Sequence, residues 1–224
     1  MAAAGKMGYP PCERPRMGIG MASLLYHEGN RRLQDQFASR RLADRLEQVI
    51  LRPEFTDADR AFIESAEYFF LATADAEGRP DCSFKGGPAG FARVTAPGEL
   101  AFPDYDGNGM FKSLGNIAVN PGVGLLFIAM GERPARLRVN GTATVARDDP
   151  LLADFVGAQL VVRVRARAVF PNCPRYIPTA EGPSVYIPRE GEVPVEPAWK
   201  GFESFRDAVP PRAPAPPRPG KGGG

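Results

Sequence analysis

The chain has 224 residues, of which 43% are hydrophobic and 24% charged, a composition that is typical of a globular protein with a buried core. Its 28 basic residues nearly balance its 26 acidic ones, and three of the basic residues, Arg212, Arg218 and Lys221, lie in a Pro/Gly-rich C-terminal stretch. Because the rest of the chain is close to neutral, we expect no nucleic-acid-binding surface.

The N-terminal part is predicted to hold a flexible segment and two helices. Residues 1–20 are rich in Gly, Pro and Arg, which predicts the flexible segment. Over residues 28–51 apolar side chains recur at helical spacing, which predicts one amphipathic helix that ends before Pro53. Thr56 and the acidic residues after it predict the start of a short second helix, which runs to about residue 66.

Short apolar or alternating runs then predict six or seven strands, joined mostly by short turns. The predicted strands cover residues 68–73, 80–85, 90–94, 99–103, 123–130, 136–146 and 159–170, with short helices at 113–119 and 150–156. This order indicates a mainly β fold, a barrel-like antiparallel sheet with peripheral helices. We expect a single domain over residues 21–207, with the N-terminal helices and a C-terminal arm, and a disordered basic tail over residues 208–224.

Two polar segments are candidates for a phosphate site. Ser83 and Lys85 are two residues apart on a predicted strand, so both project from one face, and two glycines follow them. Asn108, Lys112 and Ser113 lie in a Gly-rich turn and at the start of the helix after it, where an anion can bind. The alternative is an ordinary turn followed by a capped helix, since Gly-rich turns are common.

Arginines alternate with apolar residues on two predicted strands. Arg136 and Arg138 lie on the face opposite Leu137 and Val139. Two interpretations stay open, a face that lines a ligand site or a solvated edge strand whose charges discourage aggregation. The solvated strand is the favoured interpretation for a second set, Arg163, Arg165 and Arg167.

Catalytic and metal-binding side chains are scarce. The three cysteines, Cys12, Cys82 and Cys173, are widely spaced with no CxxC pair, which argues against a disulfide framework and a zinc site. The single histidine, His27, is interpreted as a surface or capping residue rather than a base, and no metal is expected. No apolar run approaches the roughly 20 residues of a membrane span. The N-terminus has no apolar signal segment, so we expect a cytoplasmic protein that binds no membrane.

Three consecutive segments together resemble a known family. They read GRPDCSFKGGPAGFARV, LAFPDYDGNGMFKSLGNIAVNPGVGLLFI and RLRVNGTATV, and the match covers roughly residues 62–170. The segments resemble the pyridoxamine 5′-phosphate oxidase-like family of flavin-binding split β-barrels. The upstream stretch YHEGNRRLQDQFASRRLADRLE and the downstream NCPRYIP are similar to features of a bacterial branch of predicted flavin-nucleotide-binding proteins. The sequence has no dinucleotide fingerprint, P-loop, GxSxG or HExxH motif.

The resemblance implies a homodimer with FMN at its interface. In the family, the flavin phosphate is held by the strand that matches residues 83–85 and by the loop and helix that match residues 108–113. The strand that matches RLRVNG faces the flavin. The residues expected to bind the cofactor are therefore Ser83, Lys85, Asn108, Lys112, Ser113, Arg136 and Arg138.

Three departures from the vitamin-B6 oxidases narrow the expected function. Pro80 stands where those enzymes have an arginine, Arg136 stands where they have a glutamine, and their C-terminal substrate-gripping motif has no counterpart. The resemblance therefore implies a flavin-dependent oxidoreductase that acts on an unknown small substrate or electron donor. The alternative is a non-catalytic flavin carrier or sensor that acts through partner proteins.

Overall fold

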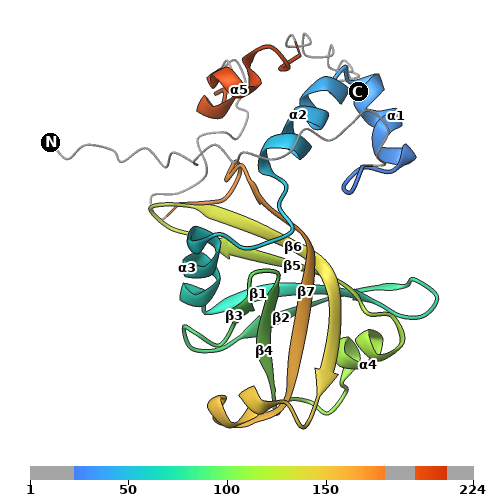
Figure 1. Cartoon of the computed structure of the whole chain (residues 1–224), viewed down its shortest axis with the longest axis vertical. Coiled ribbons are helices and arrows are strands. Elements are labelled where there is room, and N and C mark those ends of the chain that lie inside the picture. The colour runs from blue at the N-terminus through green and yellow to red at the C-terminus, as the bar shows by residue number, and fades with distance from the viewer. Residues whose placement is uncertain (1–22, 180–194, 211–224) are drawn as a thin grey trace, which may run out of the picture. The chain divides into compact units, whose positions relative to one another are not determined.

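The chain forms two compact units (Figure 1). The computed structural model describes residues 23–179 and 195–210. Of the described residues, one unit comprises residues 23–49 and 199–210, and the other comprises residues 50–179 and 195–198.

The predictions for the two ends of the chain fall largely on residues that the structure does not describe. The predicted flexible segment, residues 1–20, lies outside the described residues, and so do residues 211–224 of the predicted tail. The expectation of a single domain over residues 21–207 stays a prediction. Among the described residues, no helix combines the length and the apolar character needed to cross a membrane.

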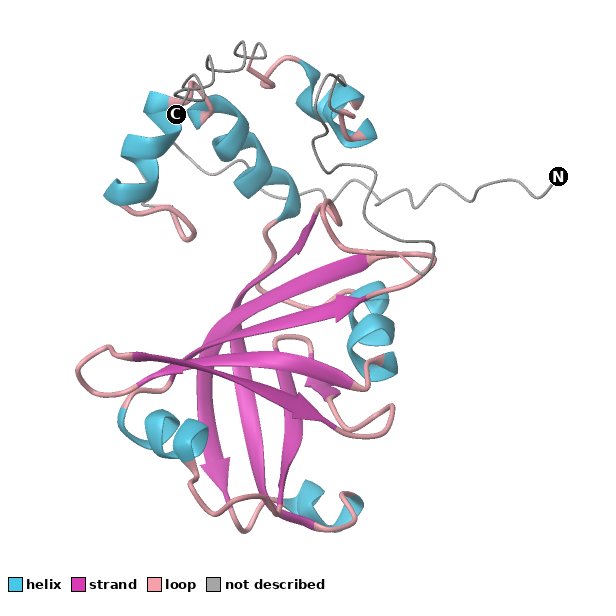
Figure 2. Ribbon diagram, turned by 180° about the vertical axis from the view of Figure 1, so that it is seen from behind, coloured by secondary structure: helices cyan, strands magenta, loops and turns pink. Residues whose placement is uncertain are grey.

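The larger unit is built on one antiparallel sheet of seven strands, which twists and curves strongly (Figures 1 and 2). The strands are β1 (Tyr68–Ala74), β2 (Pro80–Gly86), β3 (Arg93–Ala96), β4 (Glu99–Tyr105), β5 (Gly122–Ala129), β6 (Ala135–Ala146) and β7 (Ala158–Asn172). They are hydrogen-bonded in the order β2-β1-β5-β6-β7-β4-β3. The predicted fold class, a mainly β split barrel with peripheral helices, is confirmed.

Alternating apolar residues build the core of this unit. On β1, Phe69 and Leu71 are fully buried, whereas Phe70 and Ala72 project from the other face. Strands β4 to β7 and one helix contribute further core residues, which include Leu100, Phe102, Leu125, Phe127, Leu137, Val139, Val162, Val164, Leu114 and Ile117. Because successive side chains of a strand point to opposite faces, the polar residues that alternate with these core residues lie on the outer face of the sheet.

Strands β6 and β7 lie inside the sheet. Strand β6 pairs with β5 and β7, and β7 pairs with β6 and β4, so the edges of the sheet are β2 and β3. The edge-strand interpretation of the arginines on β6 and β7 is therefore wrong. The sequence pattern could not show this, because alternation gives the face of a side chain and not the order of the strands.

Arg163 on β7 is part of an ion-pair cluster. Its Nη1 lies 2.8 Å from Glu99 Oε1, and its Nε and Nη2 donate to the carboxylate of Asp149. The Asp149 side chain is only 5% exposed, whereas Arg163 is 29% exposed. The solvated interpretation of Arg163 is therefore wrong, because its guanidinium group is paired with two carboxylates of the larger unit.

Three short helices accompany the sheet (Figure 2). They are α3 (Asp57–Ser65), α4 (Lys112–Val119) and the 3₁₀ helix η1 (Pro150–Asp154), close to the predicted positions. As expected, Thr56 caps α3, and its hydroxyl accepts a hydrogen bond from the backbone of Asp59. The Asp59 carboxylate also pairs with Arg52 Nη2 at 2.8 Å, which ties the start of α3 to the segment before it.

The smaller unit contains two helices where one was predicted. They are α1 (Glu28–Gln36) and α2 (Arg40–Ile50). Ala38 between them has a φ of 49°, a left-handed conformation that ends α1. The single-helix prediction is wrong because the apolar spacing continues across this break. Near the C-terminus, the short helices η2 (Ala198–Gly201) and α5 (Glu203–Arg206) follow.

Candidate functional site

Ser83 and Lys85 project from β2 on the side of the core. In the register of β1 and β2, Ser83 lies opposite Leu71 and Lys85 lies opposite Phe69, both of them fully buried. Side chains that lie directly opposite each other in an antiparallel pair share one face. Because β2 is an edge strand, Ser83 and Lys85 remain half-buried on that face.

Helix α4 brings Ser113 to the same place. The Oγ atoms of Ser83 and Ser113 are hydrogen-bonded at 2.9 Å, and Ser113 is only 4% exposed. Lys112 beside it is exposed, and its Nζ lies 3.5 Å from Oδ1 of Asn116. We call Ser83, Lys85, Lys112 and Ser113 the β2–α4 cluster. It contains four of the five residues that were expected to hold a phosphate, and the hydrogen bond between Ser83 and Ser113 joins the two segments.

A buried hydrogen bond fixes α4 beside this cluster. Asn116 Nδ2 donates to Thr73 Oγ1 at 3.0 Å, and both residues are buried. Leu114 and Ile117 of the same helix pack into the core. The position of Ser113 is therefore set by core packing, and sequence reasoning missed the supporting residues Thr73 and Asn116, which no local motif marks.

The loop before α4 engages Asn108 internally. The Oδ1 atom of Asn108 accepts a hydrogen bond from the backbone N–H of Met110 at 3.0 Å. The residue that precedes the helix, Phe111, has a φ of 46° and provides no side-chain cap. Helix α4 therefore lacks the side-chain cap of the ordinary capped helix that was the alternative. The start of a helix carries partial positive charge, which favours an anion there.

A pocket of about 170 Å³ lies next to Lys85 in the seam of the barrel, where β2 faces the end of β4. It is lined by Phe84, Lys85, Gly86, Phe91, Pro103, Asp104 and Tyr105. Burial raises the pKa of the half-buried Asp104 carboxyl above its usual value, and the positive charge of Lys85 lowers it in part. Sequence reasoning missed Asp104, because only the closure of the barrel brings it near Lys85.

A second pocket adjoins the first. Its volume is about 320 Å³, and it shares Phe91 and Tyr105 with the seam pocket. Arg93 lines it, 3.3 Å from the Asp154 carboxylate and 4.5 Å from the centre of the Phe155 ring. The two pockets together give room for a small molecule beside Lys85.

Arg136 and Arg138 lie on the opposite face of the sheet. They alternate with Leu137 and Val139, which are buried in the core. Arg136 donates from Nε and Nη2 to the backbone oxygen of Cys173, at 2.9 and 2.5 Å, and Arg138 is exposed. Within one chain the two arginines therefore do not join the β2–α4 cluster.

Aromatic side chains share this outer face with the arginines. The strand register places Arg138 opposite Leu126, Leu126 opposite Phe70, and Phe70 opposite Phe84 on the edge strand. Phe84 is 63% exposed, and its ring stacks on that of Tyr68 with the centroids 5.5 Å apart. We call Tyr68, Phe70 and Phe84 the aromatic patch.

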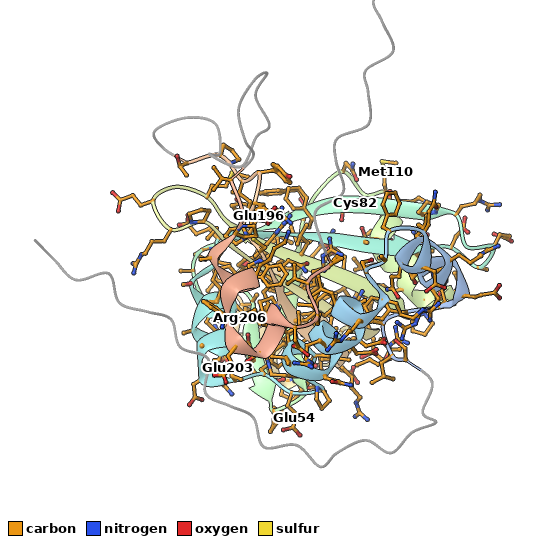
Figure 3. The ribbon with its side chains drawn as sticks, turned by 90° about the horizontal axis from the view of Figure 1, so that it is seen from above. Glu54, Cys82, Met110, Glu196, Glu203 and Arg206 are labelled. Carbon is orange, nitrogen blue, oxygen red and sulfur yellow. The ribbon has the colours of Figure 1, made fainter. Side chains whose placement is uncertain are left out.

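The histidine and the cysteines are not among the residues of the cluster. His27 caps α1, and its Nδ1 accepts a hydrogen bond from the backbone of Gly29 at 3.1 Å, so the expected capping role is confirmed. Cys82, labelled in Figure 3, is exposed on β2, and both it and Cys173 are free thiols. Cys12 lies outside the described residues.

The chain was compared with family models, curated proteins and solved structures. A family model described as pyridoxamine 5′-phosphate oxidase matches residues 55–185, more than half of the chain. A comparison with curated proteins finds no match.

Similar solved structures include three bacterial proteins. A Lactobacillus delbrueckii protein is 25% identical with a TM-score of 0.43, over 53% of this chain and 95% of its own. HupZ of Group A Streptococcus is 19% identical with a TM-score of 0.42, over 52% and 93% of the two chains. HutZ, a heme storage protein of Vibrio cholerae, is 18% identical with a TM-score of 0.39, over 52% and 94%.

Proposed function

Because this chain belongs to the pyridoxamine 5′-phosphate oxidase family, we propose that it binds FMN and holds the flavin phosphate at the β2–α4 cluster. The observation that carries the proposal is the hydroxyl pair of Ser83 and Ser113, 2.9 Å apart, on the same face of β2 as Lys85. Hydroxyls and ammonium groups are the donors that form strong, charge-assisted hydrogen bonds with phosphate oxygens.

The donor set of the cluster fits a phosphate group. A lysine side chain offers three N–H donors and no acceptor, and each hydroxyl can turn its proton toward a ligand. Lys112 and Ser113 stand at the start of α4, where the helix dipole also favours an anion. The cluster thus combines positive charge, hydroxyl donors and a helix start, and it presents no carboxylate of its own.

We infer that the protein is a homodimer whose flavin site is completed by both copies. In one chain the arginines of β6 and the β2–α4 cluster lie on opposite faces of the sheet. A second copy on the outer face would cover the aromatic patch and the unpaired edge of β2. A twofold arrangement would also bring Arg136 and Arg138 of each copy toward the cluster of the other.

We further infer an oxidoreductase that acts on a small molecule. Bound FMN supplies the reversible electron transfer, and the protein supplies binding, orientation and electrostatics. The cluster would hold the phosphate end, and arginine charges near the ring would favour its anionic reduced form. The pocket of about 320 Å³ beside the seam gives room for the substrate or electron donor.

Flavin binding and reduction test this function. The purified protein is titrated with FMN and with riboflavin while flavin fluorescence is followed, and we expect FMN to bind at least about tenfold more tightly. The complex is then mixed anaerobically with NADH or NADPH. Bleaching of the flavin that air reverses at a catalytic rate supports the oxidoreductase. Binding without reduction favours a flavin carrier or sensor, and absence of FMN binding contradicts the proposal.

A further inference from the structure

The seam of the barrel brings a carboxylate toward Lys85. Strand β3 pairs with β4 only as far as Ala101, so the end of β4 is left facing β2 across the seam pocket. Lys85 and Asp104 line this pocket from its two sides. The geometry therefore sets a negative group beside a lysine that we have assigned to phosphate binding.

Few other charges accompany Asp104 in the pocket. Within the described part of the chain, Lys85 from β2 and Tyr105 from β4 are the other titratable residues that line it. On the side of β7, Asp104 is paired in register with Leu160, which is apolar. Among the described residues no ion-pair contact joins Lys85 to Asp104, and Lys85 acts on this carboxylate through its charge without a hydrogen bond.

We propose that Asp104 is a specificity-determining residue, which weakens the binding of doubly charged phosphates at Lys85 and so sets the ligand charge that the site accepts. The inference rests on the proposed FMN site. An ionised carboxylate across a small pocket repels a phosphate dianion and does not repel the uncharged riboflavin moiety. Asp104 therefore acts on one end of the ligand only.

Protonation of Asp104 is linked to this effect. Burial already raises the pKa of the carboxyl, so its neutral form is easier to reach than that of an exposed aspartate. A phosphate dianion beside it raises the pKa further, because two like charges then oppose each other. Asp104 consequently opposes phosphate ligands most at a pH above its pKa and loses this effect as the pH falls through that pKa.

The test compares FMN with riboflavin in an Asp104→Asn variant. At about pH 8 we expect the variant to bind FMN roughly tenfold more tightly than the wild type, because removing a like charge across a small pocket is worth about one power of ten. Riboflavin affinity should stay within about twofold. The affinity ratio of variant to wild type should fall toward one as the pH is lowered through the raised pKa of the Asp104 carboxyl.

Two further variants control for charge and for folding. Asp104→Glu keeps the charge and should bind FMN as the wild type does. Asp148→Asn removes the same charge from an exposed turn after β6 and should change neither ligand. Riboflavin binding and the melting temperature report whether the Asp104 variants are folded.

The possible outcomes separate this inference from the proposed function. If the wild type binds FMN but Asp104→Asn changes FMN and riboflavin equally, or changes neither, the role of Asp104 is wrong and the FMN site stands. If neither the wild type nor Asp104→Asn binds FMN, the proposed function and the inference both fail. A selective gain for FMN that vanishes at low pH supports both.

Discussion

The two faces of the sheet hold their polar side chains in different ways. On the core side, Ser83 and Ser113 are hydrogen-bonded to each other next to Lys85, and Ser113 is held by a helix that packs into the core. On the outer face, Arg136 is bonded to a backbone carbonyl and Arg138 is exposed. Donors that are already in place lose little entropy when a ligand binds. One chain therefore holds the hydroxyls of the proposed anion site in place, whereas the outer arginines depend on what covers them.

The largest effect that we expect is on stability, and it differs between Arg163 on β7 and Arg138 on β6. Arg163→Ala should lower the free energy of unfolding by about 2 kcal/mol, because it leaves the buried Asp149 carboxylate without its partner. The value lies below that of a fully buried pair since Arg163 itself is partly exposed. Arg138→Ala should change it by less than about 0.5 kcal/mol. Urea denaturation measures both, and equal losses would contradict the distinction.

The ion pair of Arg163 and Asp149 also predicts that the free energy of unfolding depends on pH. Hydrogen bonds from Arg163 hold the pKa of Asp149 below its usual 3.8. A lowered pKa stabilises the folded state fully above the unfolded value, and the contribution is lost as the pH falls through the folded pKa. The stability difference between wild type and Arg163→Ala should therefore shrink below about pH 4. A difference that stays constant down to about pH 2 would contradict this account.

The next effect concerns the outer face. Phe84→Ser should weaken the proposed dimer at least about tenfold, because an exposed aromatic side chain on an edge strand would lose its burial against the second copy. Sedimentation over a range of concentrations measures the change. Phe37→Ser, which alters an equally exposed phenylalanine in the smaller unit, is the matched control. A wild type that sediments as a strict monomer would rule out the shared site.

A smaller effect is expected on the core side. Ser113→Ala removes one hydroxyl donor and should weaken FMN binding by about fivefold, which corresponds to a hydrogen bond of about 1 kcal/mol. Riboflavin should bind as before. Ser65→Ala, at the exposed end of α3, is the control. If riboflavin affinity drops by the same factor, Ser113 supports the fold of the pocket rather than the phosphate.

The smallest effect is expected at Arg136. Arg136→Gln removes a positive charge, and the reduction potential of bound FMN should fall by about 15 mV or less, since 15 mV of a two-electron couple corresponds to about 0.7 kcal/mol. Spectroelectrochemical titration gives the potential. An unchanged potential together with unchanged FMN affinity would limit Arg136 to its hydrogen bonds with the Cys173 carbonyl.

Much of the fold could be predicted because it depends on local patterns. The alternation around Leu137 and Val139 correctly separated the core face of β6 from the face of its arginines. Thr56 correctly indicated the start of α3. The break at Ala38 could not be predicted, because apolar spacing continues through it and alanine rarely adopts a positive φ.

The candidate site was predictable only in part. Ser83 and Lys85 could be placed on one face by their spacing, but their meeting with Ser113 spans 30 residues and was expected from the family resemblance. Asp104 was missed because its closeness to Lys85 depends on how the barrel closes. Asn108 was expected among the phosphate contacts, yet its side chain bonds to Met110 in its own loop.

The variant Lys85→Ala bears most directly on the phosphate site, because this side chain is assigned to the phosphate and to no other part of the ligand. Equilibrium titration should show FMN binding weakened at least about tenfold, as for the loss of a charge-assisted hydrogen bond, and riboflavin binding within about twofold of wild type. Arg147→Ala, an exposed cation elsewhere on the larger unit, should leave both affinities unchanged. Equal losses for FMN and riboflavin in Lys85→Ala would contradict a phosphate site at the β2–α4 cluster.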